Sequence, residues 1–433
     1  MSILLNGLYL LAVLTFSPWL LYKSLTTGKY RRGLWTKVTG NVALSPGSAP
    51  RVWFHGVSVG EIHLLRQVVK AFRQRHPDWE CVVSTTTDTG FDEACKLFAD
   101  LPVYFWPFDF TWAVRRALAT VRPSLVVLAE SETWPNFLQA ARRQSVPVAL
   151  INARMSPRSL QRYRRLSRWL PLPVAGVDLV AVQHDEYAVA FRALGVPAAT
   201  VRTTGSVKYD GVNGQRDNPR TNVLSRLLGL ETTDLVWIAG STQAPEEEIV
   251  VGIYRRLRAQ HSNLRLLLVP RQRDRFEEVA ELLQRSGLPF VRRSTLTAPP
   301  PAAAIVLVDT IGELGALWGR ADVAFVGGSL DGRRGGQNMI EPAAYGAAVT
   351  FGPHVWNFRQ DAARLVAADA ALQVSDGAEL HAVIARLCCD AAERARLGDN
   401  ARRLVAQQQG ATVRTIDLLD ELLTGTDAER RAA

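Results

Sequence analysis

Acidic residues follow short apolar runs at two places in the first half of the chain. Glu61, the first acidic residue of the whole sequence, closes the glycine-bearing turn 55–61 (HGVSVGE). Glu130 and Glu132 lie in the segment 129–136 (AESETWPN). A carboxylate at the end of a buried strand, with no basic neighbour in sequence, is costly to bury, so acid/base work or cation binding is plausible there. Glu61 is therefore a candidate general base.

Simpler interpretations stay open for these acids. A glutamate in the first turn of a helix is favoured by the helix dipole whatever its chemistry, and Glu61 would be one if residues 62–75 form a helix. Glu130 or Glu132 can instead serve N-capping around Pro135. Position alone does not separate these interpretations from catalysis.

Polar residues also follow later apolar runs. Asn152 and Arg154 come directly after residues 148–151. Lys208, one of only six lysines, lies in the segment 204–210 (TGSVKYD), just before a polar stretch. A lone lysine is usually solvated, but this one lies where a domain junction is expected.

The second half carries residues suited to binding an anion. Ser241 and Thr242 end one apolar run, and Pro270 and Arg271 end the next. An arginine there suits bidentate contact with phosphate or carboxylate. Glycines at 327–328, 332 and 335–336 precede residues 338–342 (NMIEP), where backbone N–H groups and a helix N-terminus can face an anion and Glu341 can hold ribose hydroxyls. Neither GxxxxGK[ST] nor a strict GxGxxG is present, which disfavours P-loop and dinucleotide sites.

The elements that must position these residues alternate between short apolar runs and longer helical patterns. Strands are expected at 52–54, 81–85, 125–129, 148–151 and 179–182, and then at 235–239, 264–269, 304–308, 323–326 and 348–351. Runs without polar alternation are typical of parallel sheets covered on both faces. We therefore expect two doubly wound α/β domains, joined by the polar stretch 211–221, with ligands beyond the carboxyl ends of the strands.

The net charge and the cysteine spacing limit which partners and which kinds of structural site are expected. The 433 residues carry a net charge of +10, without a recognition module for nucleic acid, so phosphate or anionic lipid is the better partner. The four cysteines have no zinc-like spacing and fit a reducing compartment without disulfides or structural metal.

The N-terminus has the composition of a membrane segment. Residues 3–22 are uncharged and mostly apolar, about the ~20 residues that a helix needs to cross a bilayer. Basic residues follow without any acid, which places the rest of the chain in the cytoplasm: Lys23, Lys29, Arg31, Arg32 and Lys37. Both a spanning and an interfacial helix fit this pattern.

Ten motifs, in this order, resemble the 3-deoxy-D-manno-octulosonic acid (Kdo) transferases of lipopolysaccharide assembly. They are HGVSVGE, SETWPN, NARMSPRS, TGSVKYD, AGSTQAPEEE, VPRQRDRF, DTIGELG, FVGGSL, GGQNMIEPA and GPHVWNF. The resemblance implies the GT-B glycosyltransferase fold: two Rossmann-like doubly wound domains facing a central cleft, with an N-terminal membrane-anchor helix. The expected boundaries are 1–24 for the anchor, 25–210 for the acceptor-binding domain, 211–222 for the linker, 223–425 for the CMP-Kdo-binding domain and 426–433 for a frayed tail.

The resemblance also implies a reaction. The family transfers Kdo from CMP-Kdo to a lipid A precursor of the lipid IVA type, with inversion and with neither a metal nor another cofactor. It works on the cytoplasmic face of the inner membrane, held there by a single anchor and in contact with anionic lipid. No oligomeric state is indicated.

Family roles carry over to matching positions. Glu61 would be the general base, Lys208 would stabilise the transition state, and one carboxylate of the second motif is essential, with Glu132 slightly favoured over Glu130. The implied CMP contacts are Pro270, Arg271, Ile311, Gly312, Glu313, Asn338, Met339, Ile340 and Glu341. Further donor or acceptor contacts are expected at Ser58, Gly60, Asn152, Arg154, Ser241, Thr242 and Gln337.

The chain departs from the family pattern at three places. Gln243, Gln272 and Gln337 stand where histidine is common, and glutamine can orient a ligand but cannot carry a proton's charge. Two rival functions also stay open: a transferase using another nucleotide sugar, such as a UDP-sugar, and a membrane-attached binding or scaffold protein without catalysis.

Overall fold

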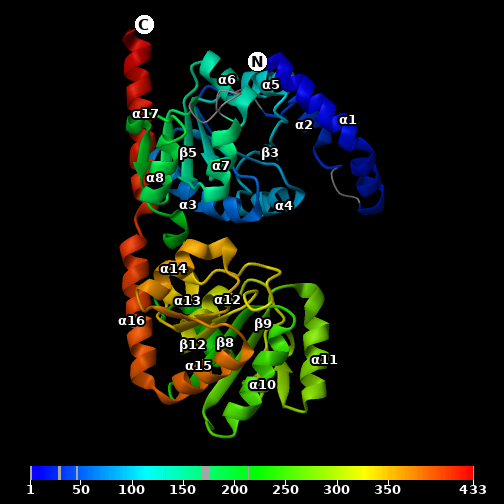
Figure 1. Cartoon of the computed structure of the whole chain (residues 1–433), viewed down its shortest axis with the longest axis vertical. Helices are drawn as coiled ribbons and strands as arrows, with labels where there is room; N and C mark the ends of the chain where they lie inside the picture. Colours follow the sequence, from blue (N-terminus) through cyan, green and yellow to red (C-terminus); the bar gives the residue numbers. More distant parts are fainter. Residues whose placement is uncertain are drawn as a thin grey trace. The chain divides into compact units, whose positions relative to one another are not determined.

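The computed structural model describes residues 2–27, 31–44, 47–131, 133–166, 176–212 and 214–432. They form two compact units (Figure 1): Met1–Gly211 with Gln408–Ala433 make up unit 1, and Val212–Gln407 make up unit 2. The domain expected at 223–425 therefore loses its last residues to unit 1.

Unit 1 is built on a seven-stranded parallel sheet in the order β3-β2-β1-β4-β5-β6-β7. The strands are β1 Arg51–His55, β2 Glu80–Thr85, β3 Val103–Phe105, β4 Leu125–Ala129, β5 Val148–Ala153, β6 Leu179–Val182 and β7 Val201–Thr203. Its helices are α1 Ser2–Thr27, α2 Leu34–Thr39, α3 Val59–Arg75, α4 Asp88–Leu97, α5 Thr111–Val121, α6 Pro135–Arg143, α7 Pro157–Leu166, α8 Asp185–Arg192 and α17 Ala411–Ala432, with the 3-10 turns η2 Ala198–Thr200 and η3 Val207–Tyr209. The strand order reverses between β1 and β4, and ligands of such sheets bind at this switch point.

Unit 2 repeats the plan with the order β10-β11-β9-β8-β12-β13-β14, again all parallel. The strands are β8 Leu235–Thr242, β9 Leu264–Pro270, β10 Phe290–Arg292, β11 Ile305–Leu307, β12 Val323–Val326, β13 Ala348–Phe351 and β14 Ala371–Gln373. The helices are α9 Pro219–Leu227, α10 Glu246–Arg258, α11 Phe276–Ser286, α12 Leu314–Leu317, α13 Ile340–Ala344, α14 Arg359–Ala367, α15 Gly377–Cys389 and α16 Ala391–Gln408, with 3-10 turns that include η4 Arg273–Arg275. Its switch point lies between β8 and β12.

All ten strands expected from the sequence are present, with ends displaced by a few residues at most. The four strands that sequence reasoning missed, β3, β7, β10 and β14, are the outermost strands of the two sheets. Each has only three residues, and each includes partly or fully exposed positions. Such short edge strands carry too few apolar residues to stand out, whereas central strands are buried on both faces.

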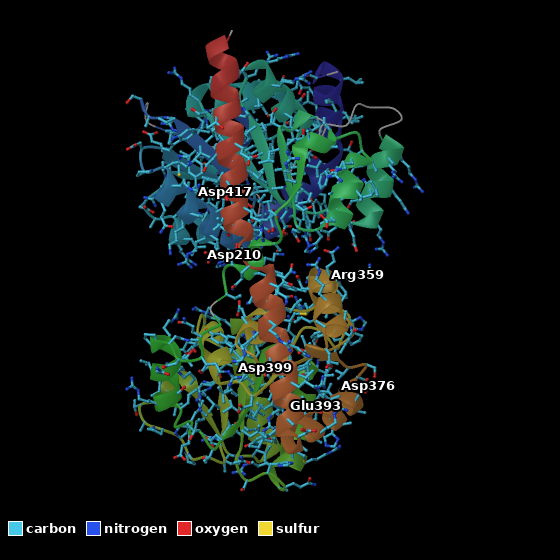
Figure 2. All side chains as sticks on the ribbon, turned by 90° about the vertical axis from the view of Figure 1, so that its left-hand side faces the viewer. Asp210, Arg359, Asp376, Glu393, Asp399 and Asp417 are labelled. Carbon is cyan, nitrogen blue, oxygen red and sulfur yellow. The ribbon has the colours of Figure 1, made fainter. Side chains whose placement is uncertain are left out.

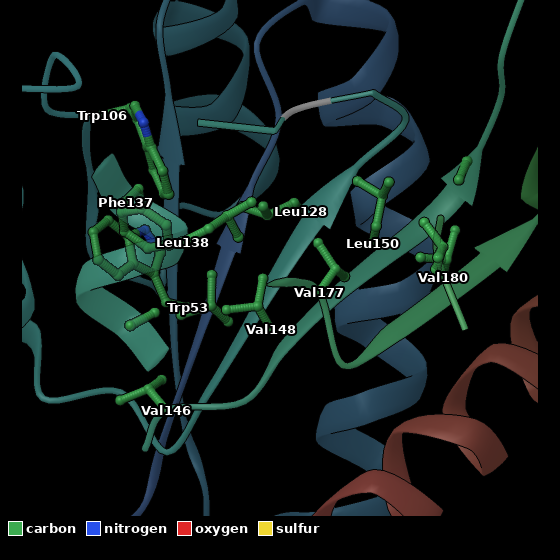
Figure 3. Packing of buried hydrophobic residues seen from close by; sticks show 14 of the residues in the cluster. Trp53, Trp106, Leu128, Phe137, Leu138, Val146, Val148, Leu150, Val177 and Val180 are labelled. Carbon is green, nitrogen blue, oxygen red and sulfur yellow. The ribbon is translucent and has the colours of Figure 1, made fainter. Parts of the chain in front are cut away.

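An aromatic cluster packs against β1, an inner strand of the unit 1 sheet (Figure 3). The ring centroid of Trp53 on β1 lies 4.7 Å from that of Trp106 and 5.5 Å from that of Phe137 on α6. All three side chains are at most 2% exposed. This packing holds β1 against α6, so the segments that follow β1 and precede α6 share one rigid support.

The C-terminal helix α17 belongs to unit 1 through specific contacts. The Asp210 carboxylate accepts hydrogen bonds from the backbone N–H groups of Gly410 and Thr412 (Figure 2). Arg75, in the last turn of α3, pairs with Asp417 at 2.6 Å and with Asp420 at 3.0 Å. These partners are about 200 and 340 residues apart in sequence, so only the folded chain could reveal the pairing.

The N-terminal segment is helical, but its expected role as a transmembrane anchor at residues 1–24 is not supported. Across the described residues, none of the helices combines the length and apolar character that a bilayer crossing requires. Polar side chains of α1 instead contact the segment before and at the start of α5 in the same unit: the Asn6 amide donates to the Thr111 hydroxyl at 2.8 Å, and the Tyr9 hydroxyl donates to Asp109 at 3.1 Å.

The basic flank behind this helix is also partly engaged. Lys37 is buried and lies 4.2 Å from the ring centroid of Phe105, while Arg32 pairs with Asp92 at 2.6 Å. Lys29 lies outside the described residues. Fewer of these cations are therefore available to a lipid surface than the sequence indicated.

Candidate active site

Glu61 lies in the first turn of α3, directly beyond the carboxyl end of β1. Ser58 is the N-cap residue, and its hydroxyl lies 3.4 Å from the backbone N of Glu61. The Glu61 carboxylate accepts the Val57 N–H at 2.6 Å and the Ser58 hydroxyl at 3.0 Å. This is a variant of the capping box, so the simpler interpretation of Glu61 as a helix-start residue is realised. It does not exclude catalysis, because each carboxylate oxygen can accept a second hydrogen bond.

The surroundings of Glu61 favour its protonated form more than water does. Burial raises the pKa of Glu61, and the nearby Glu130 carboxylate raises it further, against the opposing hydrogen bonds from Val57 and Ser58 and the charge of Arg154. A carboxylate with a raised pKa is a stronger base, which is what removing a hydroxyl proton near neutral pH requires.

Glu130 is the centre of a charge cluster at the carboxyl end of β4. Its carboxylate is 8% exposed and lies 2.7 Å from the Arg154 guanidinium and 3.6 Å from the Lys208 ammonium. Its backbone is in the left-handed region, with φ of 59°, which an unbranched residue adopts only where the surroundings hold it. One buried carboxylate thus holds two cations at the carboxyl end of β4.

Asn152 supports this cluster from β5 rather than joining it. Its side-chain oxygen accepts the N–H of Val207 at 3.1 Å, at the start of the 3-10 turn that carries Lys208. Its own carbonyl accepts the Gln183 amide at 2.8 Å, and its φ is 50°. Asn152 therefore fixes the backbone that presents Lys208.

The fold thus brings Glu61, Glu130, Arg154 and Lys208 to one region, where β1, β4 and β5 end. Ser58 is part of the Glu61 turn, and a Cβ atom at the neighbouring Gly60 would lie 3.9 Å from the Ser58 hydroxyl oxygen. Glu132 lies outside the described residues.

In unit 2, Arg271 follows β9 and presents an exposed guanidinium. Its backbone N–H donates to the Thr242 carbonyl at 3.0 Å, which ties the end of β9 to the end of β8. Pro270 is the last residue of β9, while Ser241, with φ of 57°, and Thr242 are buried at the end of β8. Among the described residues, neither a hydrogen bond nor an ion pair engages the Arg271 side chain.

Glu341 and Asn338 form a polar pair near Arg271. The Asn338 amide donates to the Glu341 carboxylate at 3.0 Å, and the Asn338 side-chain oxygen accepts the N–H of Ile340 at 3.0 Å. Burial raises the pKa of Glu341, opposed by the Asn338 hydrogen bond and by the charge of Arg271. Met339 and Ile340, expected from the family resemblance as CMP contacts, are fully buried, so neither presents an exposed surface to a ligand.

The loop 309–313 presents backbone rather than charge. The Glu313 carboxylate accepts from Arg293 at 2.7 Å and from the Thr310 hydroxyl, so it is held within the protein. Ile311 is 55% exposed, and Gly312 has a φ of 88°, a conformation that favours glycine.

The glycine loop after β12 differs from what its sequence indicated. Its N–H groups were expected to face a bound anion, but the carboxylate of Glu246 accepts those of Gly328, Ser329 and Leu330. The helix that follows, α13, has only five residues, so its dipole is short. Sequence reasoning assigned no role to Glu246, although it begins the acidic run 246–248 that closes the motif AGSTQAPEEE.

The described residues include no group of three or more His, Cys, Asp and Glu side chains that could hold a metal ion.

Comparison with known proteins decides the family. A family model described as 3-deoxy-D-manno-octulosonic-acid transferase (kdotransferase) matches residues 29–211. The 3-deoxy-D-manno-octulosonic acid transferase of Bordetella pertussis is 36% identical over 393 residues, covering 89% of this chain and 90% of that protein. The Haemophilus influenzae enzyme of the same name is 33% identical over 390 residues, 89% of each chain. This chain belongs to the Kdo transferase family.

Membership makes the protein a glycosyltransferase that transfers Kdo in lipopolysaccharide synthesis. Solved structures place the Kdo transferase in the GT-B fold. The UDP-GlcNAc 2-epimerase of Neisseria meningitidis bound to UDP-GlcNAc aligns with a TM-score of 0.56 at 12% identity, covering 86% of this chain and 100% of that one. Staphylococcus aureus MnaA with UDP aligns with a TM-score of 0.55 at 14% identity, covering 87% and 97%.

Proposed function

We propose that this Kdo transferase moves Kdo from CMP-Kdo to a lipid A precursor, with inversion at the anomeric carbon and without a metal ion. The observation that supports this most is the cluster of Glu61, Glu130, Arg154 and Lys208 at the switch point of the unit 1 sheet. It combines a carboxylate of raised pKa, which can accept a proton from the acceptor hydroxyl, with two cations paired to one carboxylate, which can stabilise an anionic leaving group.

In the proposed reaction, an acceptor hydroxyl attacks the anomeric carbon of Kdo as the bond from that carbon to the CMP phosphate breaks. Glu61 takes the proton of the hydroxyl. The sugar passes through an oxocarbenium-like state, and the electron pair of the broken bond leaves with CMP. A single displacement inverts the anomeric carbon. Lys208 stabilises the negative charge that grows on the departing phosphate, and Glu130 holds Lys208 and Arg154 in place.

The direct test uses both substrates. Mass spectrometry of the product formed from CMP-Kdo and a lipid A precursor should show a mass increase of one or more Kdo residues, and the same yield should persist in a chelator. Calorimetric titration should find CMP bound more tightly than UDP. Equal affinity for UDP, or no Kdo adduct, would refute the assignment of donor.

Arg271 is the residue of unit 2 for which we expect the clearest effect on donor affinity. Arg271→Ala should weaken CMP binding about tenfold, because an exposed charge-assisted hydrogen bond to phosphate contributes roughly 1.5 kcal/mol. Arg273→Ala is the matched control, since Arg273 is exposed two residues later. Titration of CMP into both variants measures the difference; equal weakening in both would point to general charge rather than a contact.

We further propose that unit 1 docks on the membrane through the outer face of α1 rather than by a span. Leu4, Leu8, Leu11 and Leu14, spaced by three or four residues, are 57–70% exposed, and Trp35 on α2 is 72% exposed. Apolar side chains at this spacing form one helix face, which suits burial at the boundary between headgroups and acyl chains. The cytoplasmic face of the inner membrane stays our prediction for the site of action.

Replacing Leu8 and Leu11 by glutamate should reduce binding to phosphatidylethanolamine/phosphatidylglycerol vesicles by at least about tenfold, because burying two leucines contributes roughly 3 kcal/mol or more. Val189→Glu on α8, where Val189 is 64% exposed, is the control. Co-sedimentation with vesicles measures binding. The same loss in the control, or wild-type protein that stays in the supernatant, would contradict docking through α1.

A further inference from the structure

Two adjacent glutamates at the start of α10 are almost completely buried, whereas the third is exposed. Glu246 is 0% and Glu247 1% exposed, and Glu248 faces solvent. A buried carboxylate persists only where hydrogen bonds or cations compensate for lost hydration. The partners of these two residues therefore indicate what they do.

Glu246 accepts four backbone N–H groups from two loops. One oxygen accepts from Gln243 at 3.0 Å and from Gly328 at 2.7 Å, and the other accepts from Ser329 at 2.8 Å and from Leu330 at 3.0 Å. The loops lie at the ends of β8 and β12, the two strands that flank the switch point of this sheet. A single carboxylate thus ties together the loops that border the expected donor site.

The glycines of this loop accommodate Glu246. A Cβ atom on Gly327 would lie 2.7 Å from a Glu246 carboxylate oxygen, and Gly328 has a φ of 67°. The side-chain amides of Gln243 and Gln337 flank Gly328, at 3.6 and 3.4 Å from where its Cβ would lie. Two of the residues that stand in place of family histidines therefore border the loop that Glu246 holds.

Glu247 makes a corresponding contact on the other side of β8. Its carboxylate lies 3.1 Å from the Arg275 guanidinium in η4, within the loop that follows β9 and Arg271. Arg275 also pairs with Glu278, at 3.1 Å. The start of α10 is thus linked to two of the loops that carry predicted donor contacts, those after β9 and β12.

We propose that Glu246 is a positioning residue of the donor site: it occupies the N–H groups of the glycine loop in place of the donor phosphate and fixes that loop for binding. The phosphate must then be held by side chains such as Arg271. This inference rests on the proposed function, since it concerns the CMP site of unit 2.

The main test compares Glu246→Gln with Glu248→Gln, the same change at the exposed neighbour. Glutamine is isosteric, but its NH2 group would face two of the four N–H donors. Hydrogen exchange of the amides 328–330 should accelerate at least about tenfold in Glu246→Gln, because two of the buried bonds are lost. The CMP-Kdo KM should rise about tenfold with kcat changed far less, and Glu248→Gln should match wild type in both measurements.

A second measurement needs no variant. In the wild-type protein the amides 328–330 should exchange slowly without ligand and should show no further protection when CMP binds. Fast exchange that CMP slows would mean that the loop itself takes the phosphate, which overturns the proposal. Unchanged exchange or unchanged KM in Glu246→Gln would overturn it as well.

Failure of the proposed function would look different. If the wild-type protein binds no CMP, the proposal that CMP-Kdo is the donor is wrong. Amide hydrogen exchange in Glu246→Gln compared with Glu248→Gln then decides by itself whether Glu246 fixes the glycine loop.

Discussion

Glu61→Gln should lower the rate of Kdo transfer by roughly 10²–10⁴-fold, the range that a positioned general base contributes. Glutamine keeps the shape of the side chain and one acceptor oxygen, but it cannot take the acceptor proton. CMP affinity should stay at the wild-type value, because the predicted nucleotide contacts lie in unit 2. Initial rates with saturating CMP-Kdo and a CMP titration measure the two quantities separately.

This experiment needs a stability control, because Glu61 also closes the capping arrangement with Ser58. Losing a cap destabilises a protein by about 0.5–2 kcal/mol, which a thermal or denaturant midpoint would reveal. Glu186→Gln is the matched variant: Glu186 is an exposed first-turn glutamate of α8. If Glu61→Gln keeps more than about a tenth of the wild-type rate, the simple helix-start interpretation is sufficient.

The pH dependence of the transfer rate should also show that Glu61 acts as the general base. Transfer requires the unprotonated carboxylate, so the rate at limiting substrate should rise with pH through the pKa of Glu61. Since burial and Glu130 raise this pKa, the acidic limb should lie above the ordinary glutamate value of 4.5. The three glutamines at 243, 272 and 337 should add no histidine-like limb, because an amide does not titrate in this range.

Glu130→Gln should lower transfer by roughly 10²-fold, because it leaves two cations without their shared carboxylate, and the 2.7 Å contact with Arg154 alone is of a kind worth about 1.5–3 kcal/mol. Lys208 and Arg154 would then repel each other, and Lys208 would lose the position from which it can stabilise the departing phosphate. The sequence slightly favoured Glu132 as the essential acid, whereas the contacts of Glu130 now favour Glu130.

Glu132→Gln is therefore the decisive comparison: with Glu130 as the essential acid, this variant should retain activity within about threefold. A variant of Arg154, Arg154→Gln, should lose less than Glu130→Gln because the Glu130–Lys208 pair survives. Loss of transfer in Glu132→Gln with activity retained in Glu130→Gln would reverse the assignment.

Much of the fold was readable because its central strands are buried on both faces. An apolar run such as 125–129 or 323–326 is stable only when both of its faces are buried, and the structure has strands with those bounds. The edge strands were missed because they are short and carry few apolar residues. The C-terminal stretch 391–423 was expected to be helical and is, but the packing of α17 within unit 1 depends on partners hundreds of residues away, such as Arg75 with Asp417.

For the candidate site, too, the sequence predicted some features and the three-dimensional structure was needed for others. By itself, the sequence determined the residues that could do chemistry, their order beyond strand ends and the family to which they belong. Only the tertiary structure decided which groups meet: Glu130 with Arg154 and Lys208, and Glu246 with the glycine loop 82 to 84 residues later. The reason is physical, since a glycine loop has the same sequence whether its N–H groups face a phosphate or a carboxylate of the protein. Hydrogen-bond partners are fixed by packing in three dimensions, and spacing along the chain does not specify them.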